Sequence, residues 1–152
     1  MYVLQKYKGH CDDIYKMVHF DGYLYSVGDD GIMIKWNIKN KTSGLIDKIL
    51  ILDSEPIYIT AGKFNNEIDN NLYSANIDSN IIKWKNNKEQ VFIRSEKVIS
   101  YISFIKGYLY SGDSHGIITK WNSKGENISI FVNLSDNINR FLRIAKIKRI
   151  TQ

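Results

Sequence analysis

Apolar and polar residues alternate along this chain in short runs, and glycine, aspartate or asparagine residues separate the runs. The first region of this kind predicts strands at residues 13–20, 23–27 and 32–37, with turns at Asp21-Gly22 and 28–31 between them. Alternation with period two places successive side chains on opposite faces of a strand, and an Asp-Gly pair between two such runs favours a tight hairpin. We therefore expect an all-β chain built from antiparallel strands.

The same strand–turn–strand pattern occurs three times, and each copy ends with a tryptophan. The copies read GYLYSVGDDGIMIKWN, NNLYSANIDSNIIKWK and GYLYSGDSHGIITKWN, and the serine of each Leu-Tyr-Ser run lies ten residues before the tryptophan. Trp36, Trp84 and Trp121 are separated by 48 and then 37 residues. A pattern that returns at such spacings indicates a repeat architecture with one supersecondary unit in each copy.

These residues resemble the repeats of the WD-repeat β-propeller family, and the resemblance covers about residues 2–146. The first copy matches best: Gly9-His10 opens it, and it contains Ser26, a turn aspartate at Asp30 and the final Trp36. In the family, His, Ser, Asp and Trp at these positions form a buried hydrogen-bonded chain that ties the strands of one blade together. The resemblance implies such a chain here, since a buried polar group without a partner costs about 1–3 kcal/mol.

The second and third copies keep the pattern only in part, so we expect a complete polar chain in the first copy alone. In the second copy, Asp53-Ser54 stands in place of the Gly-His pair. In the third copy, His115 occupies the position of the turn aspartate, and Asp113 lies two residues earlier. The residues of the two partial hydrogen-bond chains are Ser74, Asp78, Trp84, Ser111 and Trp121.

The resemblance implies a single WD-repeat domain, residues 1–152, that forms part of a β-propeller. A blade takes about 40–45 residues, which gives three four-stranded antiparallel blades at about 10–52, 53–94 and 95–134. In the second blade, the polar segment 65–71 is predicted to be a projecting loop.

Two further segments predict strands outside these blades. Residues 2–7 read as the outer strand of a preceding blade, and residues 138–146 read as the first strand of a fourth blade. The latter segment can also be drawn as a basic amphipathic helix, but its match to residues 98–106 favours a strand. Propellers close about four to eight blades into a ring, so an open arc leaves strand edges and apolar faces bare. We therefore expect association with a second copy, as a dimer, or with another protein.

The net charge of +5 arises entirely from the last fifteen residues, because the rest of the chain is balanced. A basic segment of this kind can bind nucleic acid through phosphate contacts, which makes a nucleic-acid-associated protein an alternative prediction. A skewed genome that enriches Ile, Asn, Lys and Tyr through their A/T-rich codons would explain most of the lysine excess. The basic residues concerned are Arg140, Arg143, Lys146, Lys148 and Arg149.

The single cysteine, Cys11, excludes an intramolecular disulfide and suits a reducing, intracellular compartment such as the cytoplasm. No secretion signal and no run of 18 apolar residues is found, so we predict no membrane segment.

Several residue types of enzymes and metal sites occur, but their pattern does not favour catalysis. His10, Ser26 and Asp30 are the residue types of a hydrolytic triad. Because they return in partial form in the later copies, a structural role is favoured over a catalytic one. His10 and Cys11, with Asp12 and Asp13 beside them, lack the spacing of a metal site. We predict no catalytic residue, no metal and no cofactor.

The main functional prediction is a non-catalytic scaffold for protein–protein interactions, which the family resemblance implies. Partners of such proteins commonly dock on the rim formed by the loops before the first strand and the turns after the second strand of each blade. A basic peptide is one possible partner, because the first two blades carry acids there, although aspartate also suits turns in general. A degenerate, truncated product without an active role is a further alternative. The predicted rim residues are Asp12, Asp13, Asp29, Glu55, Ile77, Lys97 and Ser114.

Overall fold

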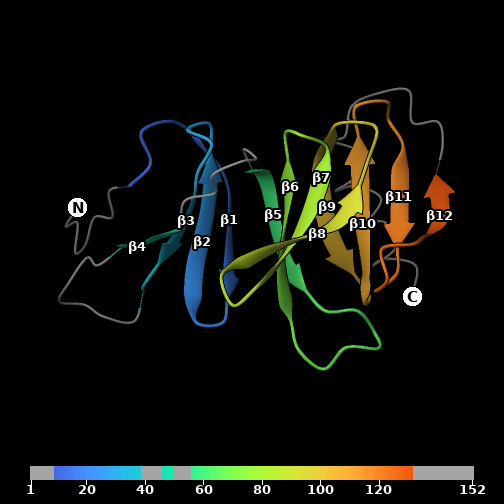
Figure 1. Ribbon diagram of the computed structural model, residues 1–152, viewed down its shortest axis with the longest axis horizontal. Helices are drawn as coiled ribbons and strands as arrows, with labels where there is room; N and C mark the ends of the chain where they lie inside the picture. The colour runs from blue at the N-terminus through green and yellow to red at the C-terminus, as the bar shows by residue number, and fades with distance from the viewer. Residues whose placement is uncertain (1–8, 39–45, 50–55, 132–152) are drawn as a thin grey trace, which may run out of the picture.

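The computed structural model describes residues 9–38, 46–49 and 56–131, with only the backbone for 46–49. All of the strands in this part of the chain belong to three four-stranded antiparallel sheets, and it contains no helix (Figure 1). The all-β prediction is therefore confirmed. The predicted strands at 2–7 and 138–146 lie outside the described residues.

Each sheet contains four consecutive strands in sequence order, and we call the three sheets blades one, two and three. Blade one consists of β1 (Ile14–Phe20), β2 (Tyr23–Gly28), β3 (Met33–Trp36) and β4 (Ile46–Ile49). Blade two consists of β5 (Pro56–Gly62), β6 (Asn71–Asn76), β7 (Asn80–Lys85) and β8 (Lys88–Arg94). Blade three consists of β9 (Ile99–Ile105), β10 (Tyr108–Asp113), β11 (Ile118–Trp121) and β12 (Asn127–Phe131).

Two-residue hairpins with both residues at positive φ connect several of these strands. Asp21 and Gly22, between β1 and β2, have φ of 49° and 76°, and Lys106-Gly107 between β9 and β10 has almost the same geometry. The hairpin between β7 and β8 uses Asn86 and Asn87 at 52° and 60°. Positive φ at both central residues matches the right-handed twist of the flanking strands, and Gly and Asn adopt it most readily.

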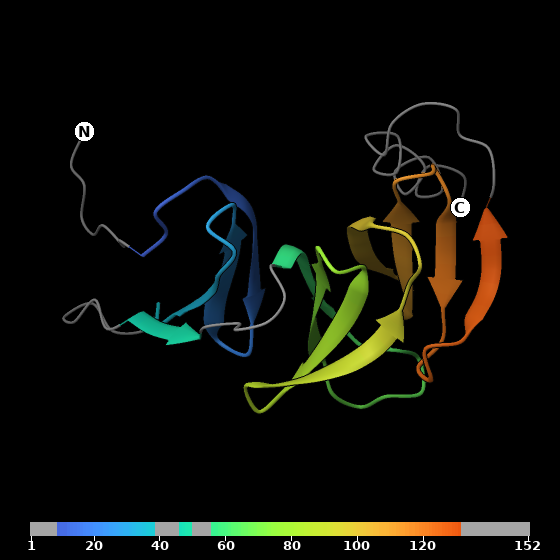
Figure 2. The same cartoon turned by 45° about the horizontal axis from the view of Figure 1, so that its top comes forward.

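The three blades lie side by side, and their first strands β1, β5 and β9 are neighbours (Figures 1 and 2). Equivalent side chains on these strands contact one another: Lys16 Nζ lies 5.1 Å from the centre of the Tyr58 ring, and the rings of Tyr58 and Tyr101 are 4.4 Å apart. The register of the first strands is therefore shared between blades.

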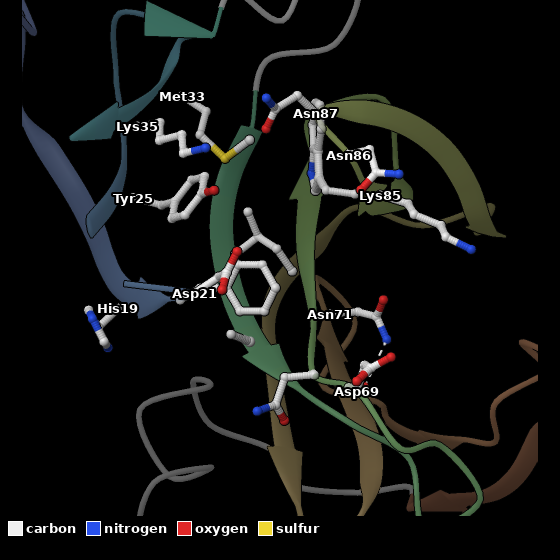
Figure 3. A pocket seen from close by; sticks show the side chains of 15 residues that line it. His19, Asp21, Tyr25, Met33, Lys35, Asp69, Asn71, Lys85, Asn86 and Asn87 are labelled. Carbon is white, nitrogen blue, oxygen red and sulfur yellow. Dashed lines mark hydrogen bonds between the residues drawn. The ribbon is translucent and has the colours of Figure 1, made fainter. Parts of the chain in front are cut away.

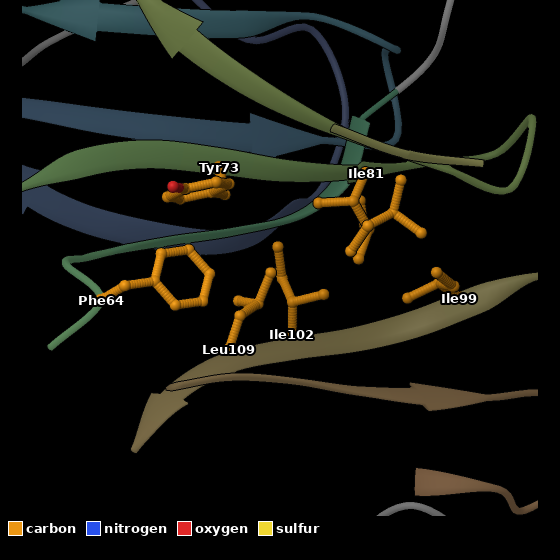
Figure 4. Packing of buried hydrophobic residues seen from close by; sticks show 8 residues of the cluster. Phe64, Tyr73, Ile81, Ile99, Ile102 and Leu109 are labelled. Atoms are coloured by element: carbon orange, nitrogen blue, oxygen red, sulfur yellow. The ribbon is translucent and has the colours of Figure 1, made fainter. Parts of the chain in front are cut away.

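Two hydrophobic clusters hold the blades together, one at each interface between neighbouring blades. Between blades one and two, Tyr25, Val27 and Met33 pack against a group from blade two that includes Ile59 and Trp84. Between blades two and three, the cluster is formed by Phe64, Tyr73, Ala75, Ile81, Ile93, Ile99, Ile102 and Leu109 (Figure 4). Because a single four-stranded sheet cannot bury both of its faces alone, each blade depends on its neighbour for much of its core.

The segment between β5 and β6 extends beyond the ends of its strands (Figure 1), and Ile68 within it is 89% exposed, but its start is anchored in the core. Phe64 is 1% exposed and packs into the cluster of blades two and three. The Asn65 backbone N–H donates to the Gly107 carbonyl (3.1 Å), and Asn66 Nδ2 donates to Ser123 Oγ (2.8 Å). The segment runs along the edge of blade two toward blade three (Figure 2), because its one buried aromatic side chain anchors an otherwise polar stretch.

Candidate functional site

A chain of four polar side chains crosses blade one from the loop before β1 to the end of β3. The Asp30 carboxylate lies 2.9 Å from His10 Nδ1, and His10 Nε2 lies 2.6 Å from Ser26 Oγ. Trp36 Nε1 donates to the same Ser26 oxygen at 2.7 Å. The structure thus brings together the four residues that the resemblance to WD repeats assigns to one hydrogen-bonded chain.

Each polar group of this chain has a partner when the proton positions are assigned consistently. Trp36 N–H donates to Ser26, the Ser26 hydroxyl donates to His10 Nε2, and His10 Nδ1–H donates to Asp30. Burial alone would raise the pKa of Asp30, but His10 and the backbone N–H groups of Cys11 and Ile32 donate to its carboxylate and lower the pKa overall. The ionised Asp30 therefore anchors the chain.

The distances resemble those of a Ser-His-Asp triad, but the surroundings do not suit nucleophilic attack. The whole Ser26 residue is 0% exposed, and the His10 and Asp30 side chains are 3% and 4% exposed. The Ser26 oxygen also accepts the indole N–H of Trp36. A nucleophile needs an open position about 3 Å away for the reacting atom, and burial denies Ser26 that access.

In blade two, the buried serine has a different partner. Trp84 Nε1 donates to Ser74 Oγ (3.0 Å), as in blade one, but the Ser74 hydroxyl donates to Asn76 Oδ1 (2.8 Å). Asp78, which the sequence pattern assigned to this chain, is exposed and accepts from the backbone and side chain of Asn80. That assignment needs correction, because Asp78 caps the turn between β6 and β7 and Asn76 takes the buried position.

Asn76 and His10 both accept the hydrogen bond of a buried serine hydroxyl, although they occupy different positions in their repeats. Gly28 holds the strand position in blade one that Asn76 holds in blade two, two residues after the buried serine. A Cβ atom at Gly28 would lie 2.5 Å from the Asp13 carbonyl oxygen and 3.2 Å from His10 Nδ1. The missing side chain at Gly28 thus leaves room for the imidazole, whereas blade two fills the same space with an amide.

Blade three has the shortest polar chain of the three. Trp121 Nε1 donates to Ser111 Oγ at 2.8 Å. Asp113, at the position of Gly28 and Asn76, accepts from the backbone N–H groups of His115 and Ile117 and so caps the turn between β10 and β11. His115 is exposed, and its Nδ1 lies 3.2 Å from Ser114 Oγ, so this imidazole is not part of the buried chain.

The described members of the predicted rim lie in the loops before β1 and β9 and in the turns after β2, β6 and β10. The Asp29 N–H donates to the Asp13 carbonyl (2.8 Å), and the Ser114 N–H donates to that of Val98 (2.9 Å), so in blades one and three the turn after the second strand lies beside the loop before the first strand. Lys97 is half-buried, Glu55 lies outside the described residues, and the others are exposed. The exposed members are Asp12, Asp13, Asp29, Ile77 and Ser114.

A cleft lies between blades one and two at the opposite edge of the sheets. Its volume is about 1020 Å³. One wall carries Tyr25 and Lys35 of blade one, and the other carries Asn71, Asn86 and Asn87 of blade two (Figure 3). No sequence pattern indicated this cleft, since it forms where two neighbouring sheets diverge.

The described residues contain no group of three or more His, Cys, Asp or Glu side chains arranged to hold a metal ion. Within the same ranges, no helix has the length and the apolar character needed to cross a membrane. The basic segment that ends the chain lies outside them.

No family model matches the chain, and no curated protein sequence is similar to it. Among solved structures, the computationally designed Ika4 protein matches with a TM-score of 0.63 and 19% identity, over 90% of this chain and 83% of that one. The WD40 β-propeller domain of Doa1 matches with a TM-score of 0.63 and 16% identity, over 84% of this chain and 42% of that one. BBS1N, solved in complex with ARL6DN, matches with a TM-score of 0.59 and 14% identity, over 78% and 39%.

The chain therefore spans less than half the length of the Doa1 and BBS1N structures that it matches. At these identities the likeness shows the fold alone. The described residues form an open arc of three β-propeller blades, as the fold prediction stated.

Proposed function

We propose that this protein is a non-catalytic scaffold that binds other proteins through the rim of its blades. The single observation that carries the proposal is the row of exposed turns on one edge, where Asp12, Asp13 and Asp29 present carboxylates from blade one. The buried position of Ser26 argues against hydrolytic chemistry at the one place with triad geometry. BBS1N, a structure of similar fold, was solved with a protein partner, which agrees with the proposal.

Basic peptides are the partner chemistry that this rim favours, because the acids of blade one would attract them electrostatically. The test is fluorescence anisotropy with a labelled, amidated Lys/Arg-containing peptide and the full chain. The double variant Asp12→Asn with Asp29→Asn should weaken binding several-fold, while Glu126→Gln, at an exposed position of blade three, should not. Equal binding by both variants, or none by the native chain at millimolar peptide, would overturn the rim proposal.

Self-association is a second part of the proposal, because exposed apolar residues lie at both ends of the described arc. Ile14, Tyr15 and Met17 on β1 are 48–55% exposed, and Ile130 and Phe131 on β12 are 52% and 46% exposed. Contiguous apolar surface on a monomer is typical of an interaction site. Sedimentation should therefore give about twice the chain mass of 17.7 kDa, and Met17→Lys should shift it toward the monomer. A native chain that sediments as a monomer at micromolar concentration would contradict this expectation.

A further inference from the structure

One lysine recurs in every blade, directly before the repeated tryptophan. The strand pairing sets Lys35, Lys83 and Lys120 each opposite the tyrosine of the Leu-Tyr-Ser run in its own blade. The Nζ atom lies 5.9, 5.7 and 5.9 Å from the centre of that ring in blades one, two and three. The three ammonium groups therefore occupy equivalent positions, and the partner of one shows what the others could bind.

In blade two, this lysine holds a carboxylate of the chain itself. Glu67 Oε1 lies 2.8 Å from Lys83 Nζ, and the two side chains are only 21% and 19% exposed. Glu67 Oε2 also accepts from the Phe64 backbone N–H and from Asn71 Nδ2, both at 3.3 Å. Blade two thus shows the occupied form of the site, in which a carboxylate is held by the lysine with neutral donors beside it.

Blade one cannot supply a carboxylate in the same way. Glu67 lies in the segment 63–70 between β5 and β6, whereas only Asp21-Gly22 connects β1 and β2. A two-residue hairpin is too short to fold back over the sheet. Lys35 Nζ instead lies 3.9 Å from the centre of the Tyr23 ring, and no described acidic side chain is within ion-pair distance of it. A cation–π contact leaves most of the ammonium N–H groups available.

The surroundings of Lys35 leave room for a partner, because Lys35 lines the cleft between blades one and two. Tyr25 and Lys35 project from blade one toward blade two across this cleft (Figure 3). Among the described residues we find no hydrogen bond to the Tyr25 hydroxyl. Burial, with Asp21 and Tyr23 nearby, raises the pKa of Tyr25 to about 12, so the hydroxyl remains a proton donor at neutral pH.

We propose that this cleft binds a peptide segment of a partner protein that presents one carboxylate to Lys35 Nζ and the Tyr25 hydroxyl, as Glu67 does to Lys83. The amides of Asn71, Asn86 and Asn87 line the cleft and offer donors and acceptors for the peptide backbone. Asp21 and Asp69 line it as well, so an isolated acid flanked by neutral or basic residues is favoured over a polyacidic sequence.

This proposal extends the proposed protein-binding role to a second site with the opposite charge preference. The cleft and the rim lie at opposite edges of the blades, because β2 (Tyr23–Gly28) connects the Asp21-Gly22 turn at the cleft to Asp29 at the rim. Failure of the rim variants would leave binding at the cleft unaffected, and failure at Lys35 would leave the rim proposal standing.

The test measures anisotropy of a fluorescein-labelled, amidated peptide, Gly-Ser-Ile-Glu-Ile-Ser-Gly, with the full chain. A hydrogen bond to a charged group contributes about 1.5–3 kcal/mol, so replacing the peptide Glu by Gln should weaken binding about tenfold or more. A third peptide, with Ala at the centre and a free C-terminal carboxylate, distinguishes a side-chain carboxylate from a terminal one. Preference for either carboxylate peptide over the amidated Gln peptide supports the proposal, and equal binding of all peptides overturns it.

Variants of the chain locate the site. Lys35→Gln should weaken the Glu peptide about tenfold, Lys35→Arg should retain binding, and Tyr25→Phe should weaken it less, because Phe preserves the ring but removes one donor. Lys124→Gln, a matched charge change on an exposed turn of blade three, should leave affinity unchanged. Circular dichroism shows whether each variant is folded. If Lys35→Gln is unfolded, then Tyr25→Phe decides, and unchanged affinity in that variant overturns the proposal.

One neighbour of Lys35 needs its own measurement. Asp47 on β4 is paired with Lys35 in the sheet register. If the Asp47→Asn variant bound the Glu peptide and the native chain did not, Asp47 would be the native partner of Lys35 and the proposal would fail. Affinity within twofold of the native chain in that variant supports an open lysine.

Discussion

Blade one and blade two bury the same serine beneath the same tryptophan, but they complete the site with different side chains. In blade one, His10 reaches Ser26 from the loop before β1 and is anchored by Asp30, while Gly28 leaves the space that it needs. In blade two, Asn76 occupies this space directly and accepts from Ser74. The constant requirement is an acceptor for a buried serine hydroxyl, and the identity of that acceptor depends on which backbone position has room for a side chain.

The two blades differ in a second respect, which bears on binding. Blade two satisfies its lysine with Glu67 from its own long segment, whereas blade one leaves Lys35 beside a cleft. In blade one, where the connection is short, the lysine is available to a partner. In blade two, a carboxylate of the long connection already binds the equivalent lysine. Internal repeats allow this comparison because equivalent positions share one register.

The largest expected effect is on the residue that the two blades share. Trp84→Ala should destabilise the protein by about 3–5 kcal/mol, because it empties a buried aromatic site and leaves Ser74 without the indole donor. Thermal and urea unfolding measure the change. A melting temperature within a few degrees of the native value would mean that Trp84 packs less tightly than the structure shows.

Substitutions at Asn76 and Gly28 test whether the two blades can use the same acceptor for the buried serine hydroxyl. Asn76→Ala should cost about 1–3 kcal/mol, because Ser74 then lacks a buried acceptor. Gly28→Asn should destabilise by a similar amount or more, because its Cβ meets the Asp13 carbonyl and displaces His10. Urea unfolding of both variants provides the comparison. A neutral effect of Gly28→Asn would show that blade one can adopt the arrangement of blade two.

Acid should distinguish the blades, because only the chain of blade one contains a carboxylate. The pKa of Asp30 is lowered in the folded protein, so its stabilising contribution is present above the ordinary aspartate pKa of about 4 and is lost as pH falls through the lowered value. Asp30→Asn should reduce stability near neutral pH and flatten its dependence below about pH 4. Equal acid profiles for the native and variant chains would contradict the role of Asp30 as the anchor.

The smallest expected effect concerns the partly exposed ion pair of blade two. Glu67→Gln should change stability by only about 0–1 kcal/mol, because the pair remains in contact with solvent. The same variant should increase the affinity of Lys83 for an acidic peptide only slightly, since the segment 63–70 still covers it. A large gain in peptide binding would instead show that Glu67 normally blocks a site equivalent to that of Lys35.

The repeat pattern was sufficient to predict the all-β fold, the strand order and most hairpins, because alternation and turn residues are local properties. Residues 14–20 and 23–28 form strands as expected from their pattern, and the Asp21-Gly22 turn has the predicted tight geometry. The sequence also indicated that each tryptophan lies ten residues after its serine partner, since the spacing recurs three times.

Three features depended on tertiary structure. Asn76 replaced Asp78 because β6 ends at Asn76, which lies two residues after Ser74 on the same face of the strand, whereas Asp78 lies beyond the strand and caps the turn. The polar segment after Phe64 lies beside blade three because the Phe64 side chain is buried against residues of that blade, which are distant in sequence. The cleft at Lys35 exists because two sheets diverge. The sequence by itself determined which residues alternate, turn and repeat, and only packing between blades decided which polar groups are paired and which remain open to a partner.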